Sequence, residues 1–153
     1  MYSKQEAAQL KQEFWTTFGR YMTPVQSAEG LKVNWINYKT GEKYVHFKMQ
    51  ADTKIASIAI EISHPDKGIQ QLYFEQLQQM KKMLSGSLNE EWRWQLHTTD
   101  ELGRTISRVY KEFKPVNIFN KEDWPQLISF FKPRIIALDD FWSSAKYGFE
   151  ALR

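Results

Sequence analysis

The chain has 153 residues, of which 42% are hydrophobic and 15% are aromatic, and it carries a formal net charge of +3. This length suits one hydrophobic core, and we expect a single domain over residues 1–153. The chain contains no cysteine, which excludes disulfides and cysteine-bound metals and is typical of a reducing compartment, so we expect a cytoplasmic protein. The small positive charge does not by itself indicate a nucleic-acid-binding protein.

No segment has the sequence of a membrane span or a secretory signal. Residues 130–142 form the longest apolar segment, but it is short and contains four charged side chains. The first six residues are polar and lack an apolar stretch. We therefore expect neither export nor contact with a membrane.

The first expected helix spans residues 4–21. Ser3 and Glu6 have the spacing of a capping box, and apolar residues then recur every three or four positions. Thr23-Pro24 ends the helix, because proline disfavours helical geometry in the residue before it. Residues 26–37 have no clear period and are expected to form a loop or a short strand.

Two hairpins and a helix follow. Residues 44–50 and 55–62 alternate between apolar and polar side chains and predict an antiparallel pair joined at Asp52. An apolar stripe over residues 69–84 predicts a helix that closes at Ser85-Gly86. Residues 92–97 and 104–113 predict two further strands, the second with a bulge or with burial on both faces.

The last helix begins after Asn120, a residue type that caps helices, and Pro125 is tolerated in its first turn. Pro133 lies well inside the helix and should bend it or split it in two. The order αββαββα predicts an α+β fold: an antiparallel sheet of about four strands with helices packed on one face and a long, kinked C-terminal helix.

Strand alternation places six polar or basic side chains on the face of the sheet that the helices leave open. A mixture of basic and aromatic side chains can form a platform for nucleic acid, although an ordinary solvated sheet face explains the same residues. The candidate binding face consists of Tyr44, His46, Lys48, Arg93, Gln95 and His97.

The last helix is apolar around much of its circumference, more than one sheet can cover. A homodimer would bury the surplus surface, and the first helix of the same chain would serve equally well. The candidate interface consists of Phe131, Ile135, Phe141 and Trp142.

Catalytic signatures are weak. Asp52-Thr53-Lys54 has the spelling of a restriction-type nuclease element, with Glu61 as a possible further acid, but polar residues of a turn explain it fully. The three histidines lack the close spacing of a zinc site, and no phosphate-binding glycine loop or nucleophile motif is present. The sequence predicts no metal, no cofactor and no catalytic residue, with a metal-dependent nuclease or phosphodiesterase as the alternative.

Several short segments occur together in a recognisable order: Phe14–Phe18, Asn34-Trp35 before Lys39–Gly41, Ile58–Ile62, Glu91–Trp94, Glu122–Pro125 and Phe131–Ile135. Together they resemble the bacterial DUF4268 family, a domain of unknown function, over nearly the whole chain. The resemblance implies a stand-alone member of a family that also occurs beside nuclease-like domains, and hence a DNA-related or defence context. It carries over no catalytic residue. We therefore expect a non-catalytic binding or interaction module, with nucleic acid or a second copy of the chain as candidate partners and a purely structural homodimerisation module as an alternative.

Overall fold

The computed structural model of the protein describes residues 3–153. In chain order its elements are α1 (Lys4–Met22), β1 (Val45–Ala51), β2 (Ala56–Ile62), α2 (Lys67–Gln79), α3 (Lys81–Leu88), β3 (Arg93–Thr99), β4 (Thr105–Phe113), a short 3-10 turn η1 (Lys121–Asp123), α4 (Trp124–Ala145) and a second 3-10 segment η2 (Lys146–Leu152). The predicted α+β fold with a four-stranded antiparallel sheet and a long C-terminal helix is confirmed.

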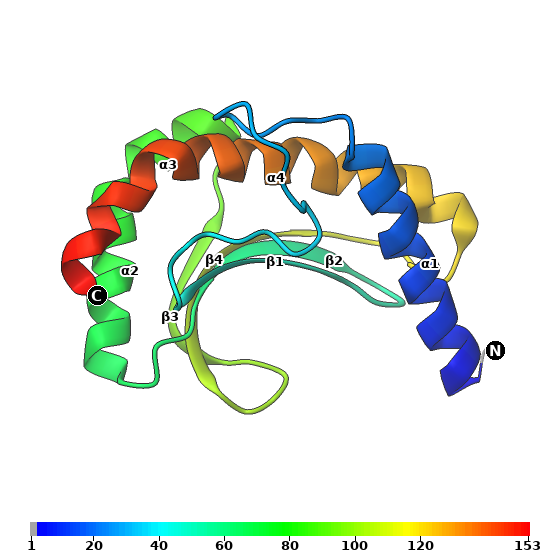
Figure 1. Ribbon diagram of the computed structural model, residues 1–153. Coiled ribbons are helices and arrows are strands. Elements are labelled where there is room, and N and C mark those ends of the chain that lie inside the picture. Colours follow the sequence, from blue (N-terminus) through cyan, green and yellow to red (C-terminus); the bar gives the residue numbers. More distant parts are fainter. Residues whose placement is uncertain (1–2) are drawn as a thin grey trace.

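The sheet has the strand order β1-β2-β4-β3, and every neighbouring pair is antiparallel. Helix α4 crosses one face of the sheet, while α1 and α2 stand at its two ends (Figure 1). No helix within residues 3–153 lies over the opposite face, so the sheet has one covered face and one open face (Figure 1). The open face is the one that the polar residues of each strand occupy.

The core lies between α4 and the covered face and is rich in aromatic side chains. Trp142 of α4 is only 2% exposed, meets the ring of Phe47 edge-on at 5.8 Å between centroids, and donates its indole N–H to the Thr40 carbonyl at 2.7 Å. This single side chain therefore joins α4, β1 and the loop before β1. The burial of a large aromatic ring with its N–H satisfied is worth several kcal/mol to the fold.

Helix α1 begins as the sequence predicts. The Ser3 hydroxyl accepts from the Glu6 amide at 3.1 Å, and the Glu6 carboxylate accepts in return from the Ser3 amide. The buried residues of α1 are Phe14, Phe18 and Met22. Its rings pack on Phe131 of α4, which fixes α1 against one end of the sheet.

Two helical boundaries differ from the prediction. The helix expected to end at Ser85-Gly86 is divided at Met80 into α2 and α3, and α3 ends with Asn89 in the left-handed conformation, at φ 54°. Asn120 caps η1 rather than α4 itself.

At Pro133 the sequence predicts either a bend or a split of the last helix. Helix α4 runs through Pro133 without being split, and Figure 1 shows it arching over the sheet.

None of the helices within residues 3–153 combines the length and the hydropathy that crossing a membrane requires.

Candidate functional site

Strand register assembles a polar surface from all four strands. In the register, His46 lies opposite Glu61, which lies opposite Arg108, which lies opposite Gln95. Because side chains alternate between the two faces of a strand, the residues two positions away on each strand share that surface. We call this surface the open face; it consists of His46, Lys48, Gln50, Ser57, Ala59, Glu61, Arg93, Gln95, Arg108, Tyr110 and Glu112.

Four of the six predicted binding residues lie together on the open face: His46, Lys48, Arg93 and Gln95. Tyr44 immediately precedes β1, and its ring packs against that of His64 at 4.3 Å between centroids. The four strand residues are therefore neighbours, as alternation predicts, and Tyr44 lies at the margin of the surface.

His97 is the one residue of this set that alternation misplaces. A bulge between Gln95 and Thr98 inserts an extra residue on β3, and His97 adopts a positive φ of 50° within it. Its Nε2 lies 3.0 Å from the carbonyl of Lys67, the first residue of α2. The extra residue breaks the period of two, so His97 contacts α2 and does not share the face of Gln95.

Lys48 is largely neutralised by two carboxylates. Its Nζ lies 2.8 Å from Glu101 Oε1 and 3.8 Å from Glu61 Oε2. Glu101 belongs to the turn between β3 and β4, which folds across the open face, and it also accepts from Gln50 at 3.2 Å. The turn that joins β3 to β4 therefore reaches across the sheet to β1, the strand at the opposite edge.

The two carboxylates respond differently to their surroundings. The hydrogen bond from Lys48 lowers the pKa of Glu101, so Glu101 is firmly ionised at neutral pH. Burial raises the pKa of Glu61, and the nearby ammonium of Lys48 opposes that rise. The open face thus combines an exposed carboxylate with one that is held in a less solvated position.

Arg108 lies near the centre of the sheet. Its guanidinium carbon is 3.9 Å from the centroid of the Tyr110 ring, and its Nε donates to Gln95 Oε1 at 2.9 Å. Within the described residues, neither Arg108 nor Arg93 forms an ion pair with a carboxylate. Among the described residues of the open face, these two arginines are the Lys and Arg side chains that have no carboxylate partner.

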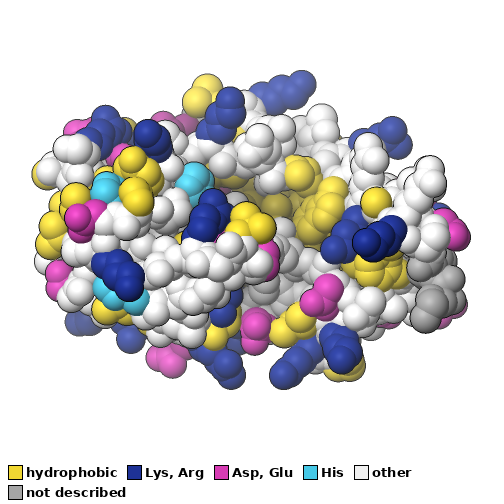
Figure 2. Space-filling model, turned by 90° about the horizontal axis from the view of Figure 1, so that it is seen from below, with side chains coloured by type: hydrophobic (Ala, Val, Ile, Leu, Met, Phe, Trp, Pro, Cys, Tyr) yellow, Lys and Arg dark blue, Asp and Glu magenta, His cyan; other side chains and the backbone are white. Residues whose placement is uncertain are grey.

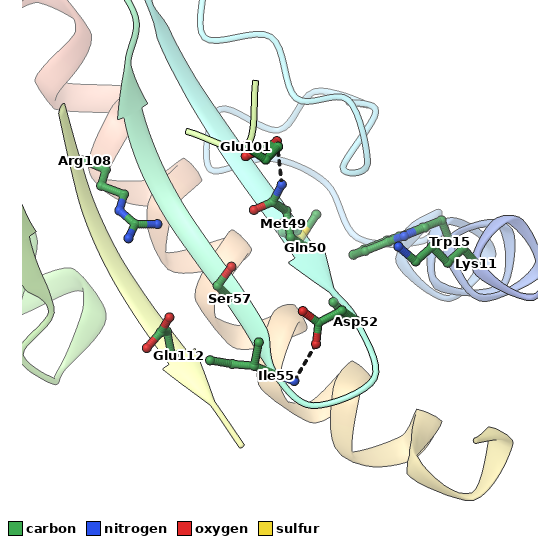
Figure 3. Close-up of a pocket in the computed structure, with 11 residues that line it drawn as sticks. Lys11, Trp15, Met49, Gln50, Asp52, Ile55, Ser57, Glu101, Arg108 and Glu112 are labelled. Carbon is green, nitrogen blue, oxygen red and sulfur yellow. Dashed lines mark hydrogen bonds between the residues drawn. The ribbon is translucent and has the colours of Figure 1, made fainter. Parts of the chain in front are cut away.

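A hollow of about 550 Å³ lies where the open face meets α1. Figure 2 shows the depression between α1 and the turn that carries Glu101, with hydrophobic side chains visible inside it and Lys and Arg side chains around it. In Figure 3, Lys11 and Trp15 project from α1 on one side, and Gln50, Ser57 and Arg108 come from three neighbouring strands on the other. The hollow therefore has an aromatic wall and a polar floor.

The sequence identifies only part of this hollow. Arg108 and Glu112 share the face of Tyr110, so strand alternation was a sufficient signal for them. Lys11 and Trp15 lie one helical turn apart on α1. The predicted apolar stripe of that helix contains neither of them, since it consists of Ala7, Leu10, Phe14, Phe18 and Tyr21. Their proximity to β1 depends on how α1 packs against the rest of the chain, and no local sequence pattern predicts that packing.

The four candidate interface residues lie inside the chain. Phe131 and Ile135 have no exposed surface, and Phe141 and Trp142 are 1% and 2% exposed. Phe131 packs on α1, and Trp142 packs on Phe47 of β1, so neighbours within the chain provide the burial. These side chains are not on the surface. Helices α1 and α3, the sheet and the loop before β1 cover the apolar face of α4 that suggested a homodimer.

The residues of the nuclease alternative do not converge. The Asp52 carboxylate accepts from the backbone amides of Lys54 and Ile55, at 2.8 and 2.9 Å, and so stabilises the β1–β2 turn. Glu61 lies further along β2 and interacts with Lys48. No group of three or more acidic or histidine side chains positioned to hold a metal ion occurs in the part of the chain that the structure describes.

Fold and site together define an α+β protein with an antiparallel sheet that is covered by helices on one face and carries a walled hollow on the other. Residues 10–146 match the model of the family described as a domain of unknown function, DUF4268. The chain belongs to this family, as the resemblance of its segments indicates. No curated protein and no solved structure matches the chain.

Proposed function

We propose that the protein is a non-catalytic interaction module that binds its partner in the hollow between α1 and the open face. The observation that carries this proposal is the hollow itself, in which Trp15 offers an apolar wall while Gln50, Ser57 and Arg108 offer hydrogen-bonding groups. Binding sites in proteins combine apolar lining with a few convergent polar groups in this way. The buried face of the sheet, by contrast, is committed to the core.

Filling the hollow should abolish binding. Ser57 lies on the floor of the hollow in the central strand β2, so Ser57→Trp places an indole in the space without disturbing the covered face. We expect a peptide enriched from a displayed random library on the wild-type protein to lose about tenfold or more of its affinity for Ser57→Trp, measured by fluorescence anisotropy.

Ser129→Trp is the matched control for this experiment. Ser129 is exposed on α4 and does not line the hollow, so this variant should bind the same peptide as the wild type does. If no peptide is enriched, or if the enriched peptides bind all three proteins equally, the hollow is not the binding site and the proposal fails.

Single-stranded nucleic acid is the second candidate ligand. It is favoured by two cations of the open face, Arg93 and Arg108. Both guanidinium groups lie on the open face without a carboxylate partner among residues 3–153, whereas Lys48 is paired with Glu101. A backbone-tracking ligand would exploit such cations, and Arg can also stack on bases. A DNA-related or defence role rests on the family resemblance alone, and it requires that the ligand is nucleic acid.

Retention of a labelled single-stranded oligonucleotide at low salt tests the nucleic-acid version. We expect binding that weakens as salt rises, and a loss of about threefold to tenfold in Arg93→Ala because one phosphate contact is removed. Lys48→Ala should have a smaller effect, since Glu101 already neutralises that ammonium. An oligonucleotide that is not retained even at low salt rejects nucleic acid as the ligand.

A further inference from the structure

Strand β1 is an edge of the sheet, and its ladder with β2 determines which backbone groups face outward. Ser63 N donates to Tyr44 O at 3.0 Å before β1 begins, and Asp52 N donates to Ile55 O at 3.0 Å just after it ends. In an antiparallel pair, hydrogen-bonded and non-hydrogen-bonded positions alternate. The even-numbered residues of β1 therefore bond to β2, and the N–H and C=O groups of Met49 and Ala51 point away from the sheet.

These outward groups have no partner within the described residues. Nearer the start of β1 the edge is covered, because the Val45 carbonyl accepts from the Thr40 hydroxyl at 2.6 Å and the Val45 amide donates to the Glu42 carbonyl. No hydrogen bond of this kind reaches the backbone of Met49 or Ala51 from elsewhere in residues 3–153. Phe47 belongs to the same alternate set and has no such partner among residues 3–153, so the free part of the edge begins after Val45 and extends to Ala51.

The free part of the edge opens into the hollow. Met49 and Ala51 both line it, and Lys11 and Trp15 of α1 form the opposite wall (Figure 3). An added strand would run about 4.8 Å from β1, on the side where the hollow lies. Paired N–H and C=O groups at every second residue of an edge are matched by one ligand chemistry, the backbone of an extended polypeptide.

We infer that the hollow receives an extended segment of a partner protein, which adds to β1 as a fifth strand. This inference rests on the proposed interaction function and names the partner's chemistry. The residue of the added strand that lies beside Met49 would be apolar, because it would face the Trp15 indole. Its neighbours in the chain would be polar, because they would lie beside Lys48 and Gln50 on the open face.

Proline substitution at the edge tests the inference. Met49→Pro removes an amide that makes no bond to β2, so the sheet should fold, while the amide needed by an added strand is lost and its place is taken by the proline ring. We expect the library-enriched peptide to lose about tenfold or more of its affinity for Met49→Pro. Met49→Ala is the control, because it keeps the amide and removes only the side chain, and it should lose much less.

Amide hydrogen exchange in the wild-type protein provides a second readout that needs no substitution. Adding the peptide should slow exchange at Met49 and Ala51 and leave Lys48 and Gln50, already bonded to β2, unchanged. The combination of lost binding in Met49→Pro and slowed exchange at these two alternate residues supports strand addition. Should Met49→Pro not fold, the exchange pattern alone decides.

The other outcomes separate this inference from the proposed function. If the peptide is lost from Ser57→Trp yet binds Met49→Pro normally and leaves both amides unchanged, strand addition is overturned while the interaction module stands. If no peptide occupies the hollow, both ideas fail. If Met49 and Ala51 are already protected in a free protein whose mass is that of a dimer, the occupant is a second copy of this chain and the inferred partner is wrong.

Discussion

Among single residues, the ion pair between Arg134 and Glu90 has a bidentate geometry in which two nitrogens bond two oxygens. Arg134 of α4 donates from two nitrogens to both oxygens of Glu90, each at 2.9 Å, and Trp92 donates to the same carboxylate at 2.7 Å. Burial alone would raise the pKa of Glu90, but the hydrogen bonds from Arg134 and Trp92 outweigh it and hold the pKa below its usual value of 4.5. Bidentate pairs of this kind stabilise proteins more than exposed point contacts do.

Arg134→Gln should therefore lower the free energy of unfolding by about 2 kcal/mol at neutral pH. A carboxyl whose folded pKa is depressed stabilises the fold above its unfolded pKa and loses that contribution as the pH falls through the folded pKa. The difference between variant and wild type should thus shrink below about pH 4.5. Urea unfolding at a series of pH values measures both effects.

Lys121→Gln is the matched control for that pair. Lys121 and Glu13 form a single contact of 2.9 Å in which both side chains are more than half exposed. Exposed pairs contribute within about 0.5 kcal/mol, so this variant should unfold like the wild type at every pH. Equal losses in the two variants would mean that burial and geometry do not set the strength of the Arg134–Glu90 pair.

At the scale of elements, α4 contains the clearest local conflict between residue and structure. Pro133 lies inside the helix and cannot donate to the Ser129 carbonyl, yet α4 continues through it. Because Pro133 is exposed, Pro133→Ala can restore the bond without changing the core, and we expect it to raise the free energy of unfolding by about 1–3 kcal/mol in denaturant titrations. A loss of stability instead would show that the local geometry at Pro133 is required for packing.

The elements that the sequence predicts well are those with a local signal. The capping box of α1 and the alternation of the first three strands each occur within a few residues, and the expected bounds of α1 and of all four strands agree with the structure within two positions. Of the two outcomes expected for residues 104–113, β4 shows burial on both faces, at Val109 and Tyr110, while the bulge lies on β3. The division at Met80 has no such signal, since neither proline nor glycine stands there. Helix α3 packs against α4 while α2 packs against the sheet and η2, so tertiary contacts redirect the chain.

At the scale of the whole molecule, the candidate site was only half predictable. Alternation placed His46, Lys48, Arg93 and Gln95 on one face, and the strand register bears that out. The period of two cannot reveal the bulge that removes His97, nor the turn that brings Glu101 over Lys48 from the far end of the sheet. These features arise from long-range packing, as does the position of α1 beside β1.

The apolar pattern of the last helix also predicts only part of the structure. Its pattern indicates correctly that α4 is buried on more than one side, but not whether a second chain or the same chain buries it. In the structure, α1, α3, the sheet and the loop before β1 share that role. The exposed backbone edge of β1, which carries no hydrophobic signature, becomes the better candidate for a contact with a partner.

Amide hydrogen exchange of the free protein, followed residue by residue by NMR, shows directly whether the edge of β1 is free, and it needs no ligand. We expect slow exchange at Lys48 and Gln50, whose amides bond to β2, and fast exchange at Met49 and Ala51, whose amides face the hollow. Slow exchange at all four residues in a monomer would show that the edge is already covered by the chain itself. The hollow would then offer no site for an added strand.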